Sequence, residues 1–293
     1  MKNPIRDKRS LLVISHPGHE LRLYGWIDQA RPLICILTDG SGGDGTSRLN
    51  KTLDILHGLG TETGSICGDL SDRRIYEGIL HHEFDLFDTL CERLAGLITA
   101  SGIDIVVSDA MEGYNPTHDL CEVLAEAAVA IANGRKSSTV RHYTFSLMGD
   151  PRQPPRGGHG LQTASCATAC HTIELTPSQF KRKLETIWNY SDTSGGKLRE
   201  EVEDAFRIYG KSAFAREYLF GAAEPSQAME PDFAQAKPFY ETYGEKQVAA
   251  GRYSSVIRFR EHMLPLINRL YAKIPVIPAT GGAGRGHAEV TEI

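Results

Sequence analysis

The sequence lacks any long hydrophobic segment. None of its 293 residues belongs to an uninterrupted apolar run of the ~18 residues that a membrane helix needs. Residues 1–10 carry charge, but no apolar run and cleavage site follow them, as they would in a secretory leader. We therefore expect a protein that neither spans a membrane nor is exported, and that resides in the cytoplasm.

An excess of basic charge is also missing. The chain has 32 Lys and Arg against 37 Asp and Glu, for a net charge of −5 at pH 7. Phosphate backbones are attracted by a positive field, which this balance does not supply. We expect no nucleic-acid partner and a small-molecule substrate, while a homo-oligomer is compatible with the sequence.

Cysteine is scarce, with six residues scattered through apolar segments. A chain of this length with so few cysteines does not resemble a disulfide scaffold, so reduced thiols are expected. Cys166, Cys170 and His171 are close enough in sequence to suggest a metal clip, but a second ligand pair at zinc-site spacing is lacking. The alternative is small apolar residues in a packed turn.

What the first half does contain is an alternation of short apolar runs with segments of helical period. Leu11–Ile14, Leu33–Leu37 and Ile103–Val107 read as buried strands. The segments Glu20–Ala30 and Leu120–Ile131 read as helices between and after them. This order predicts an α/β fold, with a Rossmann-like, largely parallel sheet flanked by helices.

A second half follows the Gly- and Pro-rich stretch Gly149–Gly160, which reads as a loop or lid and as a boundary. We expect a metal-binding α/β core over 1–150, a C-terminal part over 151–277 that packs on it as an extra helical layer, and a flexible tail over 278–293. The expected elements of this half are a strand over His171–Thr176 and helices over Pro177–Tyr190 and Val256–Ile274.

Three histidines follow predicted strands. His16 and His19 come directly after the first strand, and His118 follows the Ile103–Val107 strand. Because loops at the carboxyl ends of parallel strands converge, the three rings are expected to meet. Three neutral imidazoles suit Zn²⁺ or another divalent transition metal such as Fe²⁺, with a position left open for substrate. Alternatively, each His caps or hydrogen-bonds locally.

Three motifs occur in a recognisable order. They are His-Pro-x-x-Glu from His16, Thr38-Asp39-Gly40-Ser41-Gly42-Gly43, and Pro116-Thr117-His118. Together they resemble the LmbE/PIG-L family of metal-dependent N-acetylglucosaminyl deacetylases, over roughly residues 11–131. The resemblance implies that fold and a hydrolase that removes an N-acyl group from an amino-sugar-like or polar small molecule.

The same resemblance assigns residues one by one. His16 and His118 correspond to metal ligands, and His19 stands where the family has a liganding Asp. Gly18 stands at the position of the general base, and Asn115 at that of a His thought to act as an acid or electrostatic partner. All three metal positions therefore keep a competent ligand, while the acid/base positions do not.

Other carboxylates must then move protons if hydrolysis is retained. We hypothesise that Glu20, Glu112 or Asp109 takes this role, since a carboxylate near the ion would reach an attacking water. Glu20 has the alternative role of orienting a His ligand. Tyr114 is a candidate donor to the oxyanion, or else a lid on the pocket.

The glycine-rich loop Thr38–Thr46 has neither a Walker sequence nor the Gly-x-Gly-x-x-Gly order, so nucleotide binding is not expected. Asp39 and Ser41 of this loop, together with Asn115, are the predicted substrate-binding residues, against the alternative of a flexible turn.

The sequence leaves two rival functions open. One is redox chemistry at a three-His iron, and the other is a non-catalytic sugar- or metal-binding protein that has lost the family base.

Overall fold

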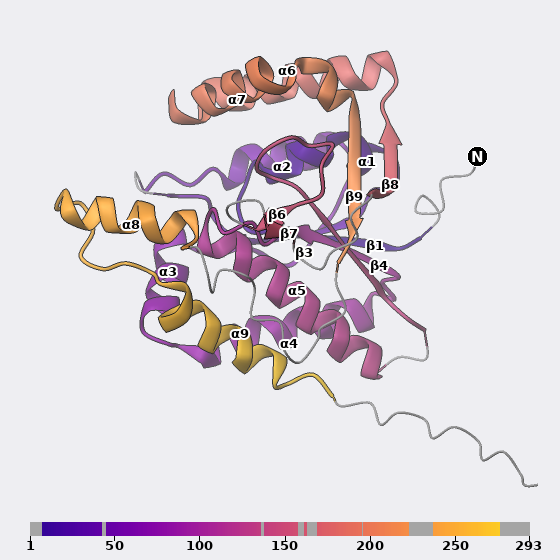
Figure 1. The fold of residues 1–293 in the computed structure, drawn as a ribbon. Coiled ribbons are helices and arrows are strands. Elements are labelled where there is room, and N and C mark those ends of the chain that lie inside the picture. Colours follow the sequence, from indigo (N-terminus) through magenta and orange to yellow (C-terminus); the bar gives the residue numbers. More distant parts are fainter. Residues whose placement is uncertain are drawn as a thin grey trace, which may run out of the picture.

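The computed structural model describes residues 8–42, 45–135, 138–157, 161–162, 169–194, 196–222 and 237–275. A seven-stranded sheet of order β3-β2-β1-β4-β5-β9-β8 forms its centre (Figure 1). The first five strands pair in parallel, whereas β9 is antiparallel to β5 and β8 to β9. The predicted fold class is confirmed. The strands are Ser10–Ile14 (β1), Leu33–Thr38 (β2), Thr63–Leu70 (β3), Ile105–Asp109 (β4), Arg141–Phe145 (β5), Ala169–Glu174 (β8) and Arg216–Gly221 (β9).

Helices cover both faces of the sheet (Figure 1). One face carries α3, α4, α5 and α9, and the other carries α1, α2, α6 and α7. The helices are Tyr24–Ala30 (α1), Leu49–Gly58 (α2), Asp72–Leu80 (α3), Phe84–Ala100 (α4), Pro116–Arg135 (α5), Pro177–Thr193 (α6), Gly196–Tyr209 (α7), Phe239–Ala249 (α8) and Leu264–Tyr271 (α9). Short elements are η1 (His19–Leu23), η2 (Lys211–Ala215) and a two-stranded sheet of β6 (Arg156–Gly157) and β7 (Leu161–Gln162).

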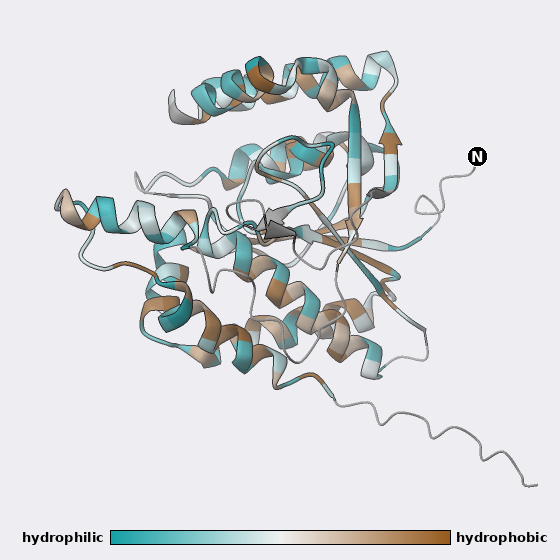
Figure 2. Cartoon of the chain, viewed as in Figure 1, coloured by the Kyte–Doolittle hydropathy of each residue, from teal (hydrophilic) through white to brown (hydrophobic). Residues whose placement is uncertain are grey.

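Two apolar cores follow from the alternation of side chains along β1. Leu11 and Val13 join the cluster with α4, α5 and α9, while Leu12 and Ile14 join the cluster on the opposite face. Strands buried on both faces have continuous apolar sequences, which is why the first strands could be recognised. Figure 2 shows brown and teal residues on different faces of the covering helices, as expected for helices with one buried side.

The C-terminal half is built into the same sheet. It supplies β8 and β9, and Glu217 of β9 accepts hydrogen bonds from the Gly25 and Trp26 amides at the start of α1. Lys183 of α6 lies 2.7 Å from Glu217, with both side chains inaccessible to solvent. Such a buried ion pair is tolerated because hydrogen bonds satisfy its partners. The expected division at residue 150 stays a prediction.

Several elements differ from the sequence-based expectation. The helix expected over Glu20–Ala30 starts as the 3₁₀ helix η1 and becomes α-helical only at Tyr24. The long helix expected over Val256–Ile274 is a π-helical turn at Phe259–Met263 followed by the shorter α9. Strand β3 was not expected, because as a half-exposed edge strand it has no continuous apolar run. The expected tail lies outside the described residues.

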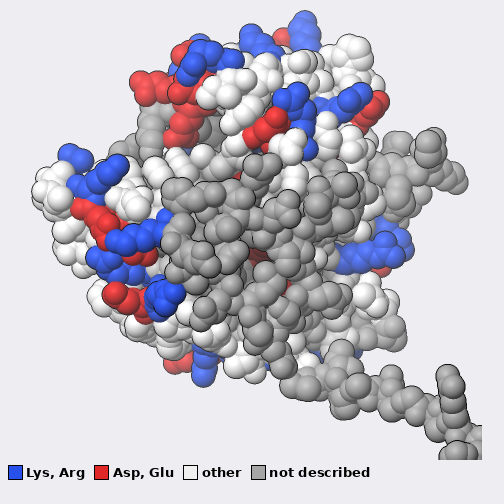
Figure 3. Space-filling model, viewed as in Figure 1, with Lys and Arg blue, Asp and Glu red and all other residues white. Residues whose placement is uncertain are grey.

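Cys35, Cys67, Cys91 and Cys121 are free, while Cys166 and the side chain of Cys170 lie outside the described residues. In the described part of the chain, every helix is too short or too polar to cross a bilayer. On the face drawn in Figure 3, basic and acidic side chains are interspersed.

Candidate active site

The three histidines lie where the strand order reverses. Strand β1 pairs with β2 on one side and with β4 on the other, which makes its carboxyl end a topological switch point. His16 and His19 follow β1, and His118 is the third residue of α5, after β4. The ring centroids are 5.3 Å apart for His16 and His19, 5.1 Å for His16 and His118, and 4.6 Å for His19 and His118. The predicted convergence of the rings is thus present.

This spacing can be compared with that of imidazoles around one ion. With zinc–nitrogen bonds of about 2.0–2.1 Å and tetrahedral angles, ring centroids stand roughly 5 Å apart. The observed centroid spacing fits. As placed, however, no group of three or more His, Cys, Asp or Glu side chains within the described residues has the geometry of a metal site. The rings are gathered, but their donor atoms are not arranged as in a metal-bound site.

Carboxylates orient two of the rings. The Nδ1 of His16 lies 2.9 Å from Asp72 and 2.8 Å from the Thr38 hydroxyl oxygen. The Nδ1 of His19 lies 2.8 Å from Asp109 at the end of β4. The opposite nitrogen of His16, Nε2, is buried without a hydrogen-bond partner among the described residues. A carboxylate on one ring nitrogen with the other left open is the usual surrounding of a metal-binding His.

The surroundings of His19 and His118 favour their neutral forms. Burial, reinforced by the neighbouring His19 and His16, holds the pKa of His118 well below its usual value. Burial lowers the pKa of His19 too, although Asp109 acts in the opposite sense. Neutral imidazole is the form that binds a metal, and its formation here requires no protons to be displaced near neutral pH.

Gly18 adopts a left-handed conformation beneath Tyr190 of α6. Its φ is 106°, a value that side-chain-bearing residues rarely adopt. The Tyr190 hydroxyl is buried without a hydrogen-bond partner in the described structure, and burial raises its pKa, so it stays protonated. A neutral phenol in the pocket can donate a hydrogen bond. Sequence reasoning missed Tyr190, since no local pattern relates it to the His16 loop.

Glu20 points away from the cavity. Its carboxylate accepts hydrogen bonds from the Gly18 amide, at 2.7 Å, and from the Thr52 hydroxyl, at 2.8 Å. Burial raises its pKa to about 7. Glu20 is not among the described residues that line the cavity, and its contacts hold the turn between His16 and His19 in shape.

Glu112 is likewise enclosed by protein groups. It accepts hydrogen bonds from the Ser146 hydroxyl and from the amides of Leu147 and Met148. Burial raises its pKa to about 7. Within the described lining of the cavity, Leu147 and Met148 are present and Glu112 is not. Glu112 therefore shapes the segment after β5 that borders the cavity.

Tyr114 does line the cavity. Its ring centroid is 6.1 Å from that of His118, and its other side stacks on Phe239 with an interplanar angle of 7°. This position does not decide between the two roles predicted for Tyr114, a hydrogen-bond donor to the oxyanion or a lid on the pocket.

The predicted substrate-binding residues are divided. Ser41 and Asn115 line the cavity. The Asn115 side chain also accepts a hydrogen bond from the Thr117 amide at the start of α5 and donates one to the Tyr76 hydroxyl at 3.0 Å. The Asp39 carboxylate accepts a hydrogen bond from the Ser41 amide at 2.9 Å, which closes a local turn. Asp39 is not among the described residues that line the cavity.

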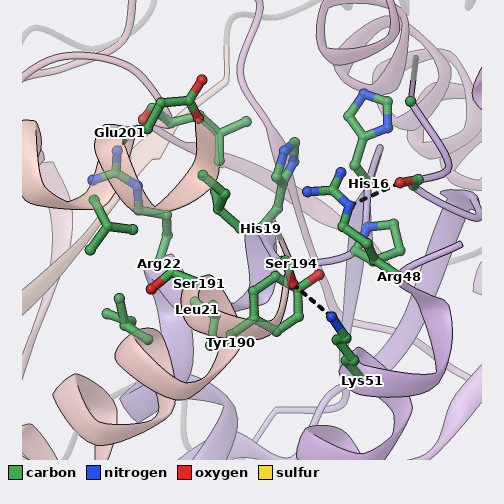
Figure 4. Close-up of a pocket in the computed structure, with 18 of the residues that line it drawn as sticks. His16, His19, Leu21, Arg22, Arg48, Lys51, Tyr190, Ser191, Ser194 and Glu201 are labelled. Atoms are coloured by element: carbon green, nitrogen blue, oxygen red, sulfur yellow. Dashed lines mark hydrogen bonds between the residues drawn. The ribbon is translucent and has the colours of Figure 1, made fainter. Parts of the chain in front are cut away.

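The cavity beside the three rings has a volume of about 720 Å³. Figure 4 shows His19 with Arg22 on one side of the view and Arg48 on the other. Arg48 donates to the Gly40 carbonyl oxygen, and Lys51 donates to Thr193 and Ser194 near the end of α6. These three cations were not predicted, since they are brought together only by the fold.

No family model matches the sequence, and no curated protein matches it significantly. Among solved structures, similarity is found to a deacetylase in the biosynthesis pathway of teicoplanin (TM-score 0.49, 15% identity, 74% of this chain and 100% of that chain). Similarity is also found to the A40926 pseudoaglycone deacetylase (TM-score 0.48, 14% identity, 75% of this chain and 98% of that chain). A third similar structure is that of a conserved protein from Thermus thermophilus (TM-score 0.46, 17% identity, 78% of this chain and 100% of that chain). At TM-scores below 0.5, these likenesses assign no activity to this chain.

Proposed function

We propose that this protein is a metal-dependent hydrolase that removes an N-acyl group from a polar, amine-bearing small molecule. The observation that carries the proposal is the convergence of His16, His19 and His118 beside a cavity of about 720 Å³. The carboxylates beside the Nδ1 atoms of His16 and His19 support it, because they leave the Nε2 atom of each ring available to bind an ion.

A divalent ion held by these rings would polarise a substrate carbonyl and make a water molecule more acidic. The chain's own residues supply the rest. Tyr190 and Tyr114 line the cavity, and their neutral hydroxyls would donate hydrogen bonds to the carbonyl oxygen as negative charge develops there. Asp72 and Asp109 hold the rings of His16 and His19 in orientation.

Glu20 and Glu112 are positioning residues in this proposal. Glu20 fixes the Gly18 amide, and Glu112 fixes the amides of Leu147 and Met148, all of which belong to residues that line the cavity. Asp39 positions Ser41 in the same way. Ser41 and Asn115 are then the polar groups that face the amine part of the substrate.

The test begins with the metal. Protein expressed in medium with balanced zinc and iron is analysed for bound metal, stripped with a chelator and reloaded with zinc. Acyl release is then measured over a panel of N-acylated amino sugars and other N-acylated amines. We expect zinc to bind at one equivalent and acid release to follow zinc content. Iron binding with oxygen uptake, or bound zinc without acid release over the whole panel, would contradict the proposal.

Variants show whether the three rings hold the ion. His16→Ala, His19→Ala and His118→Ala are each expected to lower zinc affinity and to abolish acid release. His57→Ala, at an exposed position of α2, is the matched control and should keep both. Full zinc content in the three variants would mean that the ion is bound elsewhere.

A further inference from the structure

One wall of the cavity is apolar. On α7, Leu198, Val202, Ala205 and Phe206 recur at helical spacing and all line the cavity. Phe214 continues this wall, with its ring centroid 5.1 Å from that of Phe206, and Leu21 also lines the cavity. Leu198, Val202 and Ala205 are only partly buried, so their apolar surface is open to whatever occupies the cavity.

The opposite end of the cavity is polar. Arg48 and Lys51 lie there, on the side of His16 (Figure 4), and Lys51 donates a hydrogen bond to the Ser194 hydroxyl. His19 stands between the two ends. The rings at which the amide would be cleaved therefore lie between a polar end and an apolar wall.

Arg22 is the cation at the apolar end. It donates to the Leu147 carbonyl oxygen, and its guanidinium carbon lies 5.4 Å from the centroid of the Phe214 ring. Part of its hydrogen-bonding capacity is thus used within the protein, and its stem adds to the apolar surface. Glu201, at the same end, is exposed and stands on the rim.

We propose that the acyl group removed by this site is an apolar chain longer than acetyl, and that it lies along the wall formed by α7, Leu21 and Phe214. This inference rests on the proposed function. A methyl group would cover little of the wall, whereas each added methylene buries apolar surface of both chain and protein. The amine part would occupy the end with Arg48 and Lys51. Hydrolysis breaks the amide C–N bond, adds the water oxygen to the acyl carbon and transfers both water protons to the amide nitrogen, which leaves a carboxylate and an ammonium ion.

The first experiment compares N-acetyl-, N-butanoyl- and N-octanoyl-glucosamine with zinc-loaded protein. We expect kcat/KM to rise at least ~10-fold from acetyl to octanoyl, since each methylene placed in an apolar pocket adds several-fold. A flat or falling series with measurable acetyl release overturns the inference and leaves the proposed function standing. No acid from any member of this series or of the wider panel of N-acylated amines means that the proposed function itself has failed.

A second substrate separates the two ends of the cavity. N-acetylglucosamine with an octyl group on its anomeric oxygen places the apolar chain on the amine side. We expect this chain to give a smaller gain than the octanoyl group. A larger gain would assign the wall to the amine part and overturn the inference.

Variants of α7 locate the effect. Val202→Trp fills the space beside the wall. We expect the octanoyl-to-acetyl ratio of kcat/KM to fall at least ~5-fold, because a few methylenes of the octanoyl chain would lose their contact with the wall. Ile208→Trp, on the same helix but 58% exposed and away from the cavity, is the control and should keep the ratio. Val202→Ser is the milder variant should the bulky one unfold, and it should also lower the ratio. An unchanged ratio in folded Val202 variants contradicts the inference.

Discussion

The phenol of Tyr190 fills the space above Gly18, so that a Cβ atom on Gly18 would stand 3.0 Å from Tyr190 Cε1 and 3.1 Å from the hydroxyl oxygen. Gly18 is also in the left-handed region, with a φ of 106°. The space that a side chain at position 18 would need is therefore occupied by Tyr190 of α6, a helix far from Gly18 in the sequence. A side chain larger than hydrogen at position 18 would therefore have to displace the Tyr190 ring.

We predict that Gly18→Asp lowers the free energy of unfolding by about 1–3 kcal/mol, through backbone strain and the clash with Tyr190. It should not increase acyl release. Urea unfolding and the turnover assay measure the two effects. Gly102→Asp is the matched control, because its φ is 62° while a Cβ there meets no atom of the described structure within 4 Å. A gain in turnover for Gly18→Asp would show that this site accepts a base.

Asp109 offers a test of the ring orientation. Its carboxylate is inaccessible to solvent and holds Nδ1 of His19 at 2.8 Å. We predict that Asp109→Asn weakens zinc binding by roughly 10–100-fold, the usual effect of losing a carboxylate behind a metal-binding His. Competition with a zinc-chelating dye measures the affinity. Asp104→Asn, just before the same strand, should leave it unchanged, and equal affinities in both variants would mean that Asp109 does not act through His19.

Glu112 should make stability depend on pH. Burial raises its pKa from 4.5 to about 7. Between these values the folded protein retains a proton that the unfolded chain has released, so the free energy of unfolding falls as pH rises. The slope from one such group is at most about 1.4 kcal/mol per pH unit. Glu112→Gln should flatten the decline between pH 4.5 and 7, as measured by urea unfolding at several pH values.

The control for this prediction is Glu62→Gln, at an exposed position before β3. The free energy of unfolding of the Glu62→Gln variant should fall as pH rises, in parallel with that of the unaltered protein. If the curve of Glu112→Gln were also parallel, the carboxylate would be ionised in the folded state, and its hydrogen bonds from Leu147 and Met148 would outweigh burial.

Much of the fold and the histidine cluster could be anticipated from local sequence. Strand β1 is recognisable because burial on both faces demands an uninterrupted apolar run. The rings of His16 and His118 were expected to meet because each follows a parallel strand, and such strands end at one edge of the sheet. The ligand roles of these rings, and the roles assigned to the nearby carboxylates, stay predictions.

Local sequence could not show which way a side chain turns. Glu20 is adjacent to His19, yet its carboxylate faces Thr52 and lies behind the cavity lining. Strand β3 escaped notice because an edge strand need not be apolar throughout. In each case the outcome depends on neighbours that only the assembled structure supplies.

By itself, the sequence determined the strands β1, β2 and β4 and the placement of His16, His19 and His118 after strands, because these depend on apolar runs and on residues next to one another in the chain. The tertiary structure alone decided that Tyr190 covers Gly18, that Asp72 and Asp109 orient the rings, and that α7 forms an apolar wall. The physical reason is that these contacts join residues from separate elements, so their formation depends on how those elements pack.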